Sequence, residues 1–175
     1  MCFNGIKTWQ LGWHSTFHTD LPIGDNYNWQ GNLVGFADKS LASSSDQMII
    51  RIRGYTDYYV RFNRKIGMNN GTQEGGNPVL VASRARGTGL AISDLVAKLS
   101  SGESFTIPNF NYSTVSLTLA VAEIDVQALP ARANISVQFA LSAPPFVYTL
   151  PCHRHRRPRE HRRLDNRQDD RLDNR

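Results

Sequence analysis

Apolar and polar residues alternate along several short runs in the middle of this chain. Five such runs can be delimited: residues 47–53, 58–64, 78–84, 114–126 and 134–141. Each is alternating or rich in β-branched residues, and Gly, Pro or Asn stands at its ends, which is typical of strands separated by turns. The pattern contains no long run with helical periodicity and therefore predicts a fold built from strands.

The alternation also predicts which side chains face the core. In residues 47–53 the apolar positions are Met48, Ile50 and Ile52. In residues 58–64 the core side is expected to hold Tyr58, Val60 and Phe62, and the other side Tyr59, Arg61 and Asn63. Because side chains of a strand point alternately to opposite faces, we expect Ile52 and Val60 inside, and Arg51 and Arg61 outside.

One segment carries two patterns at once. Ile92, Leu95, Val96 and Leu99 have helical spacing, whereas residues 95–99 also alternate. The next residues favour a tight turn in which Gly102 takes a positive φ, followed by a strand with Phe105 and Ile107 inward. We therefore expect strand, turn, strand, and an all-β fold: an antiparallel β-sandwich or a jelly-roll-like domain.

Composition divides the 175 residues into three parts. Residues 1–28 are rich in Trp, His and turn formers and show no sustained period, and residues 29–150 hold the strand-like runs. Residues 151–175 contain nine Arg against five acidic residues, which accounts for +4 of the chain's net charge of +5. Such a segment lacks the apolar surface to offset its ordering entropy, so we expect a disordered, solvated tail, with polyanion binding as the alternative.

The bulk properties argue against several functional classes. Outside the tail the net charge is close to zero, so no basic face for nucleic acid or a membrane surface is expected. No apolar run approaches the ~20 residues needed to span a bilayer, and no signal peptide is visible. The two cysteines, Cys2 and Cys152, define neither a disulfide framework nor a zinc site.

Two groups of histidines contain the residue types of a metal site. His14 and His18 have the i, i+4 spacing of a metallopeptidase zinc helix, but Ser15 stands where the general base belongs and the neighbouring residues disfavour a helix. Cys152, His153, His155 and His161 lie in the tail, without a second ligand pair at matching distance. The acidic residues are scattered singly and form no pair for acid–base catalysis. We therefore predict no metal site, no resident cofactor and no catalytic residue in this chain.

Aromatic residues give the chain a second functional hypothesis. If several lined one exposed face, they could stack on sugar rings, although aromatic residues in a sandwich more often pack in the core. The candidates are Tyr27, Trp29, Tyr55, Tyr58 and Tyr59.

Three sequons for N-glycosylation occur, at Asn70, Asn111 and Asn134. Chance alone would give about two in a chain of this composition, so they permit secretion without establishing it.

The opening residues carry a family resemblance. Residues 1–13 read Met-Cys-Phe-Asn-Gly-Ile-Lys-Thr-Trp-Gln-Leu-Gly-Trp and resemble the segment that follows the Met-turn in the gametolysin family of zinc metallopeptidases. Further stretches in the same order are similar to that family: residues 29–34, 59–67, 71–77, 79–84 and 107–111. The resemblance covers residues 2 to about 140, and the tail has no counterpart in it.

The resemblance implies an extracellular or periplasmic zinc endopeptidase of volvocine green algae that cleaves glycoproteins of the cell wall or matrix. In that family the zinc ligands, the general base and the Met-turn precede the Cys-Phe-Asn segment, so none of them can be transferred to a residue of this chain. Residues 1–28 would then be the end of the peptidase domain. Trp9, Leu11 and Trp13 would line the wall of the substrate cleft, or else anchor the core.

The sequence therefore supports three hypotheses about function. The first is the carboxy-terminal part of a gametolysin-like metalloendopeptidase that lacks the zinc-binding motif in this chain. The alternative is a non-catalytic β-sandwich that binds matrix glycans or glycoproteins through an aromatic face. The third is an unrecognised hydrolase.

Overall fold

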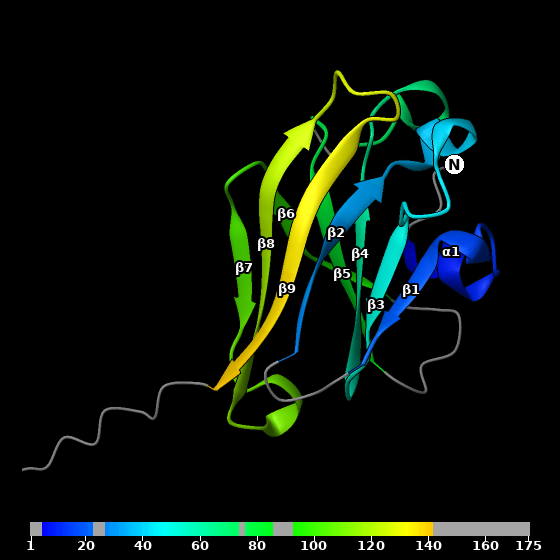
Figure 1. Ribbon diagram of the computed structural model, residues 1–175. Helices are drawn as coiled ribbons and strands as arrows, with labels where there is room; N and C mark the ends of the chain where they lie inside the picture. The colour runs from blue at the N-terminus through cyan, green and yellow to red at the C-terminus, as the bar shows by residue number, and fades with distance from the viewer. Residues whose placement is uncertain (1–4, 23–26, 74–75, 86–92, 142–175) are drawn as a thin grey trace, which may run out of the picture. The chain divides into compact units, whose positions relative to one another are not determined.

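The computed structural model describes residues 5–22, 27–73, 76–85 and 93–141, and they form two β-sheets with a hydrophobic core between them (Figure 1). The first sheet has the strand order β1-β3-β4-β5-β6 and the second the order β2-β9-β8-β7. The strands are β1 (His18–Leu21), β2 (Asn28–Val34), β3 (Ile49–Ile52), β4 (Thr56–Phe62), β5 (Val79–Ala85), β6 (Asp94–Leu99), β7 (Ser104–Ile107), β8 (Val115–Asp125) and β9 (Arg132–Leu141).

The remaining elements are short. They are the helix α1 (Gly5–Gln10) and four 3₁₀ turns, η1 (Ser15–Phe17), η2 (Phe36–Leu41), η3 (Gly67–Asn69) and η4 (Phe110–Tyr112). All strand pairs are antiparallel except β1 with β3, which run parallel. The prediction of an all-β antiparallel sandwich is therefore confirmed.

The core between the sheets follows the predicted alternation. Ile50, Ile52, Val60 and Phe62 are buried there, and Tyr58 packs against them half-buried. The second sheet contributes alternate residues of β8 and β9: Leu117, Leu119, Val121, Ala133, Ile135, Val137 and Phe139. Burial of one large aliphatic or aromatic side chain contributes about 1.5–3 kcal/mol, so this double row is the main source of stability.

The opposite face of the first sheet is also covered, which the alternation did not predict. Ile6 of α1 forms a second buried cluster with Met48, Ile49 and Tyr59. Met48 therefore does not join Ile50 and Ile52 in the main core, as the alternation predicted. Arg61, expected outside, is only 7% exposed, and its guanidinium lies 5.8 Å from the Phe36 ring. The expectation was wrong because the segment before β1, with α1, packs on this face. The alternation within a strand carries no information about a second segment that covers its outer face.

The segment with two patterns is a strand. Residues 94–99 form β6, and Gly102 takes φ 80° in the turn that leads into β7. Phe105 and Ile107 pack against the core, so strand, turn, strand is confirmed. The two strands are not a hairpin, however, because β6 is the edge of the first sheet and β7 the edge of the second. The turn at Gly102 carries the chain from one sheet to the other.

The described part of residues 1–28 is built into the sandwich. β1 pairs with β3, from His18 opposite Ile49 to Leu21 opposite Ile52. Helix α1 covers the first sheet, and β2 begins at Asn28. The assignment of this segment to the end of a peptidase domain remains a prediction. The tail, residues 151–175, lies outside the described residues, so its disorder stays a prediction.

Candidate functional site

A shallow pocket lies at one end of the sandwich, where the turn between β3 and β4 meets η4 (lower end in Figure 1). Its volume is about 180 Å³, and its lining is mostly aromatic and amide: Tyr55, Thr56, Tyr58, Ile107, Asn109, Phe110, Asn111 and Tyr112. Pockets for drug-sized ligands have volumes of about 300–1,000 Å³, so this one would take a single ring or a short side chain.

The backbone of η4 is held in an unusual conformation. Asn109, Asn111 and Tyr112 have φ of 49°, 56° and 57°, in the left-handed region that residues other than Gly seldom adopt. One hydrogen bond fixes the segment to the neighbouring turn: the Tyr55 amide donates to Asn111 Oδ1 at 2.7 Å. Strained backbone that is held by its surroundings is found preferentially at functional sites.

A glycine makes this close approach possible. A Cβ atom at Gly54 would lie 2.5 Å from Asn111 Oδ1 and 2.6 Å from the Thr56 carbonyl oxygen, so no other residue fits without moving η4. The amide of Gly54 also donates to Asp57 Oδ1 at 3.1 Å, which fixes the turn from its other side.

Two of the tyrosines are presented to solvent. Tyr55 is 69% exposed and Tyr112 90% exposed, and their ring centroids lie 5.3 Å apart with the planes at 59°. Behind them the half-buried Tyr58 packs on Phe110 at 5.9 Å, and burial raises the pKa of its hydroxyl. The site thus combines apolar ring faces with phenol and amide groups that can donate and accept hydrogen bonds.

The structure brings together some of the predicted aromatic candidates and separates others. Tyr55 and Tyr58 line the pocket, whereas Tyr59 is buried on the opposite side of β4, and Tyr27 and Trp29 pack half-buried against the core. The aromatic residues of η4 were missed. The Asn-Phe-Asn-Tyr run at 109–112 was a usable signal, since Asn is enriched in the left-handed region, but sequence separation gives no indication that it meets Tyr55.

The histidine pair is not presented as a metal site. His14 has a left-handed backbone before η1, and His18 is the first residue of β1, so no helix aligns them. The His18 ring stacks on Trp9 at 4.4 Å, and burial lowers the pKa of both imidazoles. Within residues 5–22, 27–73, 76–85 and 93–141, no group of three or more His, Cys, Asp or Glu side chains could hold a metal ion.

The three residues proposed for a cleft wall fall into two environments. Trp9 is half-buried between the His18 ring and the Arg51 guanidinium, which lies 4.6 Å from its ring centroid. Leu11 is 48% exposed and Trp13 46% exposed. Trp9 thus packs against neighbouring side chains of the sandwich, and contact of Trp9, Leu11 and Trp13 with a substrate stays a prediction.

The three sequon asparagines also differ. Asn70 is exposed at the end of η3, and Asn111 holds the aromatic pocket through its side-chain oxygen. Asn134 lies within β9, where its Nδ2 donates to Asn32 Oδ1 at 3.1 Å. Of the three, Asn70 is the most accessible, and modification of each remains a prediction.

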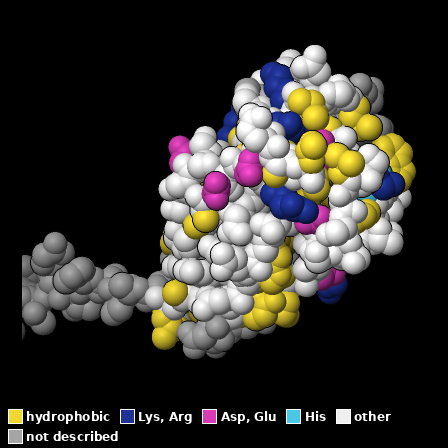
Figure 2. Space-filling view, turned by 45° about the horizontal axis from the view of Figure 1, so that its top comes forward, with side chains coloured by type: hydrophobic (Ala, Val, Ile, Leu, Met, Phe, Trp, Pro, Cys, Tyr) yellow, Lys and Arg dark blue, Asp and Glu magenta, His cyan; other side chains and the backbone are white. Residues whose placement is uncertain are grey.

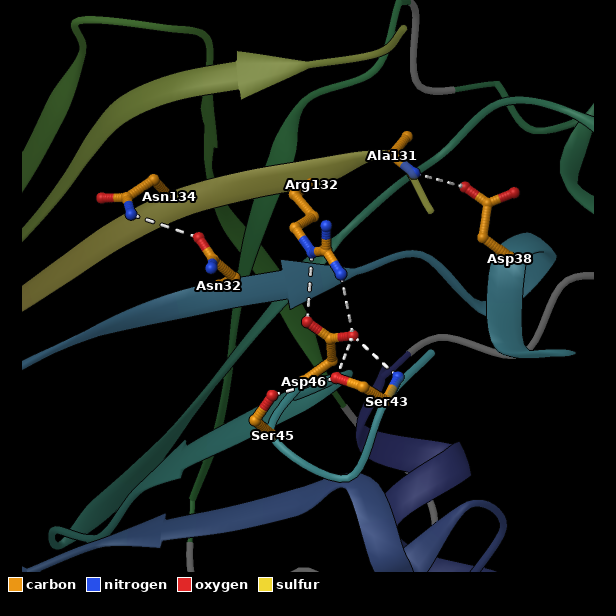
Figure 3. A network of polar contacts seen from close by, with 8 residues as sticks. All are labelled: Asn32, Asp38, Ser43, Ser45, Asp46, Ala131, Arg132 and Asn134. Carbon is orange, nitrogen blue, oxygen red and sulfur yellow. Dashed lines mark hydrogen bonds and ion pairs between the residues drawn. The ribbon is translucent and has the colours of Figure 1, made fainter. Parts of the chain in front are cut away.

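A polar cluster connects the loop after η2 to the start of β9 (Figure 3). Asp46 accepts hydrogen bonds from the Ser43 amide and hydroxyl at 2.8 and 2.9 Å and pairs with Arg132 at 3.2 Å. Burial opposes ionisation of Asp46, but these donors outweigh it and lower its pKa. Asp38 accepts from the Ala131 amide at 3.2 Å. These contacts fix where β9 begins, which is a structural role.

In the part of the chain that the structure describes, no helix has the length and apolar character of a membrane span. Comparison with protein-family models, with curated proteins and with solved structures finds no match for this chain.

Proposed function

We propose that this chain is a non-catalytic β-sandwich module that binds glycans of cell-wall or matrix glycoproteins. The observation that carries the proposal is the pocket at the end of the sandwich, where Tyr55 and Tyr112 expose their rings beside Asn109 and Asn111. The pyranose ring of a sugar has apolar C–H faces and a rim of hydroxyl groups, so a tyrosine pair flanked by amides matches both.

The strained backbone of η4 supports binding over packing. An exposed tyrosine in a left-handed conformation adds little to the core, since Tyr112 is 90% exposed. A cost of about 1–3 kcal/mol is typical for such backbone, and it is retained where the strained arrangement presents a group for use. Because the Tyr55 amide and Asn111 fix the two segments to each other, less backbone entropy is lost when a ligand binds.

The family resemblance gives this module a context. Under this proposal the chain is the carboxy-terminal part of a gametolysin-like zinc metalloendopeptidase, and zinc belongs to a catalytic part of the family that this chain's residues do not supply. The module would act outside the cell or in the periplasm and hold the enzyme on its glycoprotein substrate. Leu11 and Trp13, exposed on a different segment, would be the candidates for contact with a cleft.

The test is affinity electrophoresis in native gels that contain hydroxyproline-rich cell-wall glycoprotein or the glycans released from it. Tyr55→Ala and Tyr112→Ala should each weaken binding by a factor of about 2 to 10, since one aromatic stacking contact contributes roughly 0.5–1.5 kcal/mol. Leu41→Ala is the control, because it removes an exposed large side chain of another segment, the end of η2, to which no contact is assigned. Loss of binding with Leu41→Ala and not with the tyrosine variants would overturn the assignment of the pocket.

A further inference from the structure

The outward face of the second sheet differs from ordinary solvent-exposed sheet surface. Because Leu33, Leu119 and Val137 point into the core, the alternate positions of their strands point outward. Across the middle of the sheet these positions carry no charge and, apart from Ala120, hold polar side chains: Asn28, Gln30, Ser104, Thr106, Thr118, Ser136 and Gln138.

Charge is confined to one end of this face. The four strands of the sheet contain only Glu123, Asp125 and Arg132 as charged residues, and all three lie where β8 ends and β9 begins. Figure 2 accordingly shows wide areas without charged side chains. The first sheet has a different surface, with Arg51, Arg53 and Asp20 forming ion pairs at its edge. Roughly a quarter to a third of the residues on a soluble surface are commonly charged, so the absence of charge over most of one face distinguishes it from ordinary surface.

The polar groups of this face are already connected to one another. Gln30 Nε2 donates to Asn134 Oδ1 at 3.1 Å, and Asn134 Nδ2 donates to Asn32 Oδ1 at 3.1 Å, which gives a ladder of amides across β2 and β9. The hydroxyls of Thr106 and Thr118 lie 3.0 Å apart on β7 and β8. Groups held on strands in this way present fixed donors and acceptors, at a lower entropic cost on binding than loop side chains.

The charged end of the face is hollowed. A pocket of about 200 Å³ is lined by Asn32, Glu123, Asp125, Ala128, Arg132 and Asn134. Arg132 is held in place by its pair with Asp46 (Figure 3). Carboxylates accept two hydrogen bonds and a guanidinium donates several in a fixed geometry, which suits the adjacent hydroxyls of a sugar.

From these observations we infer a second binding surface: the outward face of the β2-β9-β8-β7 sheet binds an uncharged, hydroxyl-rich glycan chain, with one end of the chain in the pocket at Arg132. This inference rests on the proposed function and extends it from one sugar ring at the tyrosines to a chain on the sheet. A polyanion would require a row of cations, and an apolar partner would require exposed large side chains. Amide and hydroxyl groups complement a neutral glycan.

The experiment compares retardation of the full chain in native gels that contain soluble neutral mannan, soluble neutral galactan or anionic polygalacturonate. Gln138→Lys places a bulky charge in the middle of the face, and Val96→Lys places the same charge on the exposed edge strand β6 of the other sheet. We expect Gln138→Lys to weaken binding of a neutral polysaccharide at least about tenfold and Val96→Lys to leave it unchanged. Raising salt from about 50 to 500 mM should leave retention of the wild type unchanged, because the contact involves few ions.

The outcomes separate this inference from the proposed function. If Gln138→Lys binds like the wild type while Tyr55→Ala and Tyr112→Ala bind weakly, the sheet surface is overturned and the aromatic pocket stands. If only Gln138→Lys loses binding, the sheet surface stands and the pocket is overturned. Retention by polygalacturonate alone, with steep salt dependence, would overturn the neutral chain as occupant. Thermal unfolding of both lysine variants shows that a loss of binding is not a loss of fold.

Discussion

At the scale of single residues, the buried side chains of Asp38 and Asp46 hold loop segments in place through hydrogen bonds. Asp46 belongs to no sequence motif that would predict a structural role. Its side chain is nevertheless only 4% exposed, and it accepts hydrogen bonds from Ser43 and Arg132. We predict that Asp46→Ala lowers the free energy of unfolding by about 1–3 kcal/mol, since the buried carboxylate would no longer hold Ser43 and Arg132 through charge-assisted hydrogen bonds. Ser45→Ala, which removes an exposed hydroxyl of the same loop, should stay within about 0.5 kcal/mol of the wild type. Equal values from urea unfolding of the two variants would contradict the structural role of Asp46.

Asp20 gives the stability a dependence on pH. Burial raises the pKa of its carboxyl, but hydrogen bonds from Arg51 and Arg53 outweigh burial and lower that pKa from 3.8 to about 2. A carboxyl with a depressed pKa in the folded state stabilises the fold above its unfolded value, and this stabilisation is lost as pH falls through the folded value. Urea unfolding between about pH 5 and pH 2 should therefore show a steeper fall for the wild type than for Asp20→Asn. Parallel curves would contradict the pairing, and high salt should reduce the difference because the pair is partly exposed.

At the scale of elements, burial on both faces of the first sheet determines which substitutions in β3 and β4 should prevent folding. Ile52→Asp and Val60→Asp should abolish soluble expression, because an unpaired buried carboxylate costs several kcal/mol against a total stability of about 5–15 kcal/mol. Arg61→Asp should also lower soluble yield strongly, since its position lies under Gly5 of α1 and beside Phe36. Lys98→Asp, exposed on β6, is the matched control and should be tolerated. A yield for Arg61→Asp as high as that of Lys98→Asp would mean that this face is open.

The elements also show how far sequence patterns reach. Alternation located the strands that became β3, β4, β5, β8 and β9, because period two is a local property of the chain. The parallel pairing of β1 with β3 and the position of β6 and β7 in different sheets depend on long-range pairing, which no local pattern encodes. The same holds for the aromatic pocket: Tyr55 was a candidate from its type, whereas its contact with Tyr112 arises only when two distant turns meet.

At the scale of the whole molecule, the two ends of the chain should differ in what they contribute. Residues of the main core extend from Leu21 to Phe139, and the second cluster depends on Ile6. A chain that ends at residue 144 keeps every one of these side chains and removes the Arg-rich segment, so its melting temperature should change by no more than about 2–4 °C, equivalent to ~1 kcal/mol.

A chain that begins at residue 23 loses β1 and α1, and with them the pairing of β3 and the cover over Ile49 and Tyr59. Exposure of such an apolar surface beside an unpaired strand should make the shortened protein aggregate. The measurements are soluble yield and thermal unfolding of both truncated chains. A soluble, cooperatively folded chain from residue 23 would show that residues 5–22 are an appendage to the sandwich, and not one of its layers.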